Sequence, residues 1–167
     1  MSAEWQEIDF NMDVWIIPAS KAKNGITHRV PLTDLALNLL TEIKALSGHS
    51  RWIFPAPPTL NKDTHMTGSA IDHALRRSKD AFQNIEGFSP HTLRATTATN
   101  MASLRISGET ISRILNHAKK GVTEQHYIKH TYDEEKRHAL ESWSQKLNEI
   151  INGETASNVI EIKKAAS

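Results

Sequence analysis

The pattern of apolar residues changes after residue 32, and this change constrains the fold more than any other feature of the sequence. Glu7–Phe10 and Val14–Ile17 have the composition of short strands, and Thr27–Leu32 reads as a third strand. Before the third strand, Asn24-Gly25 predicts a tight hairpin, because both residue types tolerate the positive φ angles of such a turn. Residues 7–32 are therefore predicted to form a small antiparallel sheet of three strands.

Beyond the sheet, apolar residues recur at helical spacing. One predicted helix places four apolar residues on one face, with Gly48 just past its end: Leu35, Leu39, Ile43 and Leu46. Ser89-Pro90 predicts a helix start, with serine as the cap and proline at the first helical position, and Ser107 predicts another. A last helix, over about residues 134–150, carries the stripe Leu140, Trp143, Leu147 and Ile150. The fold class expected is α+β, mainly α, with residues 1–150 as one domain and 151–167 as a C-terminal tail.

Composition limits the class of protein. The chain has no cysteine, which excludes disulfides and thiolate metal sites and favours a reducing cytoplasm. No apolar run approaches the length that spans a bilayer, and the first residues lack the basic and apolar regions of a signal peptide. We therefore expect no membrane partner.

Charge is unevenly distributed along the chain, although the formal net charge is only +1. Residues 1–13 carry four acidic residues and no lysine or arginine, whereas residues 73–130 carry nine lysines and arginines against four acidic residues. Five of the nine histidines also fall in the second segment. This pattern indicates a basic face that meets an anion, although ordinary surface charge explains it equally well.

His91 and Arg94 stand three residues apart at the start of the helix that Ser89 caps, so they share one helical face. The first turn of a helix also presents free N–H groups and a partial positive charge. A guanidinium, an imidazole and these backbone donors together suit a phosphate. The HxxR spacing is common, however, and by itself it is more typical of two exposed polar residues in an ordinary first turn.

Further short motifs follow His91 and Arg94 in order, and together they make the pattern more specific than HxxR alone. Leu115-Asn116-His117 ends the next helix, and Tyr127 follows ten residues later. With Lys23 upstream, this set resembles the tyrosine recombinase, or phage integrase, family. The resemblance extends over roughly residues 4–148. The matching segments are the lysine hairpin from Ile16 to Leu32, Trp52–Pro55, Phe88–Thr96, Ile114–His117 and the tail Glu134–Trp143. The tail is similar to that of prophage integrases.

The resemblance implies site-specific DNA recombination, with a role for each matching residue. Tyr127 would be the nucleophile that forms a 3′-phosphotyrosyl link, and Arg94 and His117 would bind the phosphate oxygens. His91 would be the acid–base partner near the attacking hydroxyl, and Lys23 would protonate the departing 5′ oxygen. No metal or other cofactor is implied. Lys21 remains an alternative to Lys23, and Tyr132, the other tyrosine of the chain, an alternative nucleophile.

The implied partners are double-stranded DNA and other integrase protomers in the bacterial nucleoid. The C-terminal helix is expected to dock on a neighbouring protomer, with packing onto its own core as the alternative. The family also has an arginine on a helix before the first strand. Met1–Asp9 is similar to the end of that helix and the start of the sheet. We therefore expect this arginine upstream of Met1 and little cleavage by these residues alone.

Two other classes of protein are alternatives to the recombinase. A remnant integrase domain would keep the fold and bind DNA or assemble without catalysing a reaction, and the missing arginine favours it. A metal hydrolase would use the nine histidines, but the chain has no HExxH motif and no cysteine. The histidines other than His91, His117 and those flanking Tyr127 are expected on the surface, His28 among them.

Overall fold

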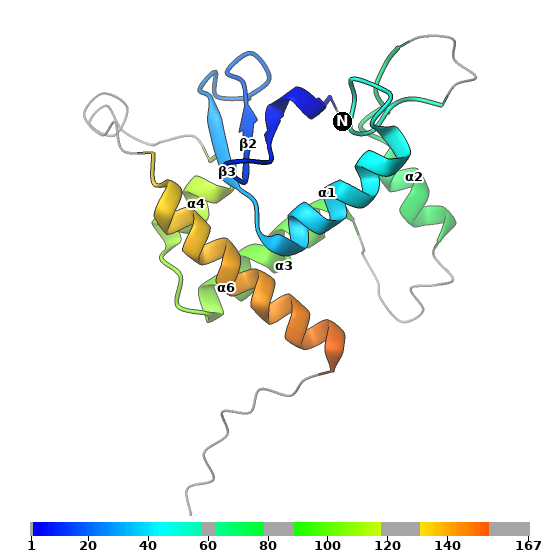
Figure 1. Ribbon diagram of the computed structural model, residues 1–167. Coiled ribbons are helices and arrows are strands. Elements are labelled where there is room, and N and C mark those ends of the chain that lie inside the picture. Colours follow the sequence, from blue (N-terminus) through cyan, green and yellow to red (C-terminus); the bar gives the residue numbers. More distant parts are fainter. Residues whose placement is uncertain (1, 58–62, 79–88, 118–130, 154–167) are drawn as a thin grey trace, which may run out of the picture.

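A computed structural model describes residues 2–57, 63–78, 89–117 and 131–153 (Figure 1). Within these ranges the chain is mainly helical with one small antiparallel sheet, which confirms the predicted fold class. The elements, in chain order, are a short 3-10 helix at Trp5–Glu7, β1 Ile8–Asp9, β2 Val14–Ile17, β3 His28–Pro31, α1 Asp34–Ser47, α2 Ala70–Arg77, α3 Pro90–Ser103, α4 Gly108–Ile114 and α6 Asp133–Asn152.

The sheet has the strand order β1-β2-β3, and both pairs are antiparallel. Ile8 pairs with Trp15, and β2 pairs with β3 over its whole length, from Val14 with Pro31 to Ile17 with His28. β2 ends where the sequence predicts, because Pro18 has no N–H to continue the ladder. The three predicted strands are therefore confirmed.

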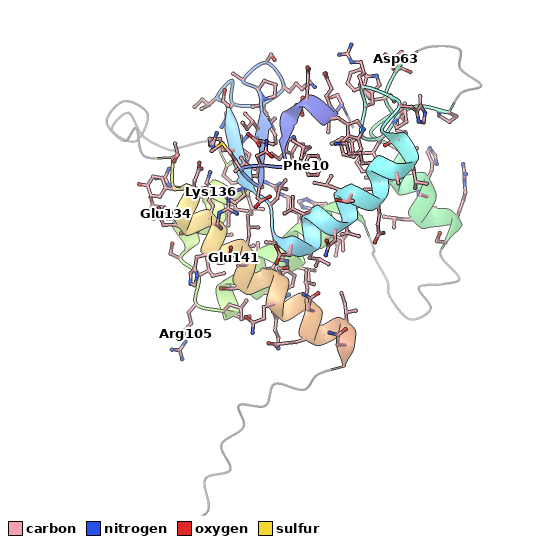
Figure 2. The ribbon with its side chains drawn as sticks, viewed as in Figure 1. Phe10, Asp63, Arg105, Glu134, Lys136 and Glu141 are labelled. Carbon is pink, nitrogen blue, oxygen red and sulfur yellow. The ribbon has the colours of Figure 1, made fainter. Side chains whose placement is uncertain are left out.

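One face of α1 packs against the sheet, and it includes only part of the predicted apolar face. The buried residues Ile8, Leu32 and Ile53 form a core that Leu37, Leu40 and Ile43 contact from α1. Ile43 belongs to the predicted apolar face, but Leu39 and Leu46 of the same face are 52% and 78% exposed. This helix carries apolar residues on two sides, so helical periodicity alone does not identify the buried side. Figure 2 shows Phe10 between the sheet and α1, where it belongs to the same core.

A second group of helices packs against the other end of the sheet. α6 contacts β3, α3 and α4, and each of the three helices buries one apolar residue: Met101 on α3, Ile111 on α4 and Ala139 on α6. The first half of α6 therefore packs onto its own chain, which was the alternative to docking on a neighbour. The far end is open to solvent, since Ile150 and Ile151 are 58% and 70% exposed. No helix in the described ranges is long and apolar enough to cross a membrane.

Candidate functional site

The predicted start of α3 is confirmed, and it presents two of the proposed site residues. Ser89 Oγ accepts a hydrogen bond from the Thr92 N–H at 3.1 Å, and Pro90 occupies the first helical position. Proline fits there because the first N–H groups of a helix have no partner within it. His91 and Arg94 follow in the first turns, and both are exposed.

The end of α4 presents the third residue, His117, through a left-handed turn. Asn116 has a φ of 52°, and its N–H donates to the Arg113 carbonyl at 3.1 Å. The His117 N–H reaches back to the Ser112 carbonyl at 3.0 Å, which completes a Schellman cap. The turn needs a residue that tolerates positive φ, which asparagine does better than most residues. The Leu115-Asn116-His117 box is thus a helix stop that turns His117 out to solvent.

Two carbonyls that this stop leaves without helical partners accept hydrogen bonds from distant segments. The Arg94 guanidinium donates through Nη2 to the Leu115 carbonyl. His28 Nε2 lies 3.2 Å from the Ile114 carbonyl. α3 and β3 therefore meet at the end of α4, and Arg94 and His117 belong to the same corner of the fold.

His28 is partly buried in this corner rather than fully exposed on the surface, which corrects the sequence-based expectation. Burial lowers the pKa of His28, and the positive charges of Lys136 and Arg94 lower it further, against the opposing effect of its bond to Ile114. The neutral imidazole with its proton on Nε2 then donates to the Ile114 carbonyl. The sequence gives no signal for this role, because it depends on a contact across 86 residues.

The loop between β2 and β3 carries Lys23, but it is not the tight hairpin that Asn24-Gly25 predicts. The last paired residues are Ile17 and His28, so the connection spans residues 18–27. Gly25 has a φ of +67°, whereas Asn24 is not among the residues with positive φ, so the two-residue turn does not form. Asn24 Oδ1 instead accepts from the Ile26 N–H at 3.2 Å, and the Gly25 N–H donates to the Ala22 carbonyl at 2.9 Å. Pro18 ends the strand pairing well before the Asn-Gly pair.

This loop touches the α4 stop through a side-chain bond. Asn24 Nδ2 donates to Asn116 Oδ1 at 2.8 Å, across 92 residues of sequence. Lys23 precedes the first asparagine and His117 follows the second. The structure therefore brings together the three segments that carry Lys23, Arg94 and His117, with His91 one turn before Arg94. Neither asparagine was predicted as a site residue, and only the contact identifies them.

The two lysines of the loop have different surroundings. Lys21 forms ion pairs with Glu4, at 2.7 Å, and with Glu7, and it also donates to the Ser2 carbonyl. Desolvation opposes the charged form of Lys21, but the two carboxylates outweigh it and raise its pKa above the usual value. Lys23 is exposed and has no hydrogen bond or ion pair within the described ranges. Lys21 is thus bound to the fold, and Lys23 is available to a ligand.

Tyr127 lies outside the described residues, and the described chain resumes at residue 131, just before α6. Tyr132 precedes α6 with a φ of 54°, and the Arg113 guanidinium lies 3.6 Å from the centre of its ring. At the first residue of α6, Asp133 pairs with Arg29 at 2.7 Å and with Lys136 at 2.8 Å. Tyr132 is thus engaged in packing at the start of α6. No group of three or more potential metal ligands occurs among the residues that the structure describes.

Comparison with known proteins identifies the family. The model of the phage integrase family matches residues 1–134. Prophage integrase IntA of Escherichia coli (strain K12) is 31% identical over 142 residues, which are 85% of this chain and 33% of IntA. The integrase of Enterobacteria phage P4 is 29% identical over 161 residues, 87% of this chain and 36% of that protein. The chain therefore spans about a third of the length of these curated relatives, and no solved structure matches it. On the family match over residues 1–134, the chain belongs to the phage integrase family of tyrosine recombinases.

Proposed function

We propose that residues 1–150 form the catalytic domain of a site-specific DNA recombinase that cuts and rejoins DNA through a 3′-phosphotyrosyl intermediate. The observation that carries this proposal is the meeting of three distant segments at the end of α4. Arg94 bonds to the Leu115 carbonyl, Asn24 bonds to Asn116, and His117 follows directly. The segments that meet there carry a guanidinium, an exposed imidazole and an exposed ammonium, which are donors that bind a phosphate.

The proposed reaction exchanges one phosphate ester for another. The Tyr127 hydroxyl loses its proton as its oxygen attacks the phosphorus, and His91 is the acid–base partner for that proton. The bond from phosphorus to the 5′ oxygen breaks, and Lys23 gives that oxygen its proton. Arg94 and His117 donate to the non-bridging oxygens, where negative charge grows in the transition state. Because the new ester keeps the energy of the old one, a later attack by a DNA hydroxyl rejoins the strand.

Arg94 keeps N–H groups that can donate to a phosphate after its bond to the Leu115 carbonyl is made. A guanidinium carries five N–H groups in a planar fork, and the Leu115 carbonyl accepts from one nitrogen, Nη2. That bond fixes the direction of the side chain at an exposed position. A fixed guanidinium stabilises a charged transition state better than a free one, because it needs no reorganisation when the charge develops.

The proposed partners are duplex DNA and further copies of the recombinase in the bacterial nucleoid. The first half of α6 is covered by its own chain, so a contact in trans would use the far end of the helix. The exposed side chains of Ile150 and Ile151 support that location. A non-catalytic remnant that only binds DNA remains the competing proposal.

Strand cleavage by the full-length protein tests the proposal. The DNA substrate is the attachment site, identified from the junctions that border the gene's mobile element, with a nick that traps the intermediate. We expect a covalent protein–DNA adduct that resists denaturant. Arg94→Ala should slow its formation by about a hundredfold to a thousandfold, the usual cost of one preorganised donor.

Arg105→Ala is the matched control, since Arg105 is exposed and points away from the α4 corner (Figure 2). It should form the adduct at nearly the parent rate. Duplex binding without any adduct would favour the remnant, and equal loss in both variants would contradict the assigned role of Arg94.

A further inference from the structure

The bond between Asn24 and Asn116 joins the two loops that carry proposed site residues. It measures 2.8 Å from Nδ2 to Oδ1. Lys23 and His117 are the sequence neighbours of these two amides. Any displacement of the Lys23 loop relative to the His117 turn must therefore stretch or break this bond.

Both amides are held by their own backbones before they meet. Asn24 uses its Oδ1 to accept from the Ile26 N–H, which leaves Nδ2 to donate across. Asn116 is fixed in the left-handed conformation by the two hydrogen bonds that close the end of α4. Because asparagine has few rotatable bonds, such a contact loses less entropy than one between long side chains.

The loop around Lys23 is anchored on both sides. On the side toward β2, Lys21 is bound to Glu4 and Glu7. On the side toward β3, Asn24 is bound to Asn116, and His28 to the Ile114 carbonyl. Lys23 itself has no partner within the described ranges, so its backbone is held while its long side chain stays available.

We propose that Asn24 and Asn116 are positioning residues. The hydrogen bond between their side-chain amides holds the Lys23 ammonium at the leaving 5′ oxygen. This inference rests on the proposed function, because it needs Lys23 as the proton donor. Neither amide is assigned a contact with DNA. Loss of the bond lets the loop sample other positions, and misplacement of a proton donor slows the step that needs it.

Three variants isolate the bond from other effects. Asn24→Ala removes the donor, and Asn116→Gly removes the acceptor while keeping a residue that favours positive φ. The double variant tests whether the two act together. Asn38→Ala, at an exposed position of α1, is the matched control. Each single variant should cut ordinary DNA roughly tenfold more slowly, the equivalent of one hydrogen bond, and the double variant should be no slower.

A substrate with sulfur at the 5′ bridging position separates positioning from general damage. Thiols have a pKa of about 8.5, far below that of an alcohol, so a thiolate leaves without a donated proton. Cleavage of this substrate should restore Asn24→Ala, Asn116→Gly and Lys23→Ala to within about twofold of the parent. Arg94→Ala should stay slow on both substrates, because its role is independent of the leaving group.

Each outcome decides between the proposals. Variants of Asn24 or Asn116 that stay slow on the sulfur substrate, or that match the parent on ordinary DNA, overturn the positioning role and leave the proposed function intact. Failure of sulfur to restore Lys23→Ala overturns Lys23 as proton donor, and the inference falls with it. A parent protein that cuts neither substrate refutes the proposed function itself.

Discussion

Replacement of Lys136 by methionine should destabilise the chain, because this ammonium is buried between α6 and β3. Lys136 is 4% exposed, and Figure 2 shows it at the start of α6 beside the sheet. Its Nζ donates to the Arg29 carbonyl at 2.6 Å and pairs with Asp133 at 2.8 Å. Methionine keeps most of the apolar stem and removes the charge, so packing changes little.

The expected loss follows from the partners that remain. A hydrogen bond that involves a charged group contributes about 1.5–3 kcal/mol, and its removal leaves the Arg29 carbonyl without a donor. The ammonium no longer has to be desolvated, which offsets part of this loss. Asp133 keeps its ion pair with Arg29 at 2.7 Å, so the Asp133 carboxylate still has a positively charged partner. We expect Lys136→Met to lower the free energy of unfolding by about 2 kcal/mol.

Urea unfolding followed by far-UV circular dichroism measures this change. Lys146→Met is the matched control on the same helix, where the ion pair with Glu149 is more exposed and should contribute less than about 1 kcal/mol. The urea dependence of unfolding should be the same in all variants. A neutral or stabilising Lys136→Met, or equal losses in both variants, would refute the buried role of this lysine.

Three further outcomes are expected. Burial and nearby positive charge lower the pKa of His28 in the folded state, so the unfolded state takes up its proton first as the pH falls below about 6.5. The contribution of His28 to the free energy of unfolding is present above that pH and should be lost as the pH falls through the folded pKa. The substitution His28→Gln should weaken the pH dependence of the free energy of unfolding, measured by urea titration. A variant with the same pH dependence as the parent would contradict this role of His28. Lys21→Met should lower the urea midpoint, because it removes the cation between Glu4 and Glu7, whereas Lys23→Met should leave it nearly unchanged; equal midpoints would contradict the contrast. Binding of duplex DNA by the 167 residues alone should be weak and should fall steeply with salt in a fluorescence titration, since phosphate contacts dominate such affinity; tight binding that is insensitive to salt would be inconsistent with it.

Local chemistry explains why much of the fold was predictable. Ser89 and Ser107 cap helices as expected, and each accepts a backbone N–H at 3.1 Å. The three strands also follow from β-propensity and from Pro18, which ends β2. The buried side of α1 was not predictable, because its sequence offers two apolar faces and the choice is made by tertiary packing.

The candidate site divides in the same way. The order of the motifs marks Lys23, His91, Arg94, His117 and Tyr127, and resemblance to a family supplies a role for each. What holds them was not visible in the sequence, because the bonds of Asn24 with Asn116 and of His28 with Ile114 join segments about ninety residues apart. The extended loop also departs from the Asn-Gly rule, since Pro18 stops strand pairing before the turn residues are reached.

The most direct test of the proposed function is the identity of the atom that becomes joined to DNA. After the full-length protein reacts with its nicked attachment site, protease and nuclease digestion followed by mass spectrometry locates the modified peptide. We predict a 3′-linked nucleotide on Tyr127, with loss of the adduct in Tyr127→Phe and its retention in Tyr132→Phe. A nucleotide on Tyr132 or on another residue, a 5′ linkage, or an adduct that survives Tyr127→Phe would contradict the proposed mechanism.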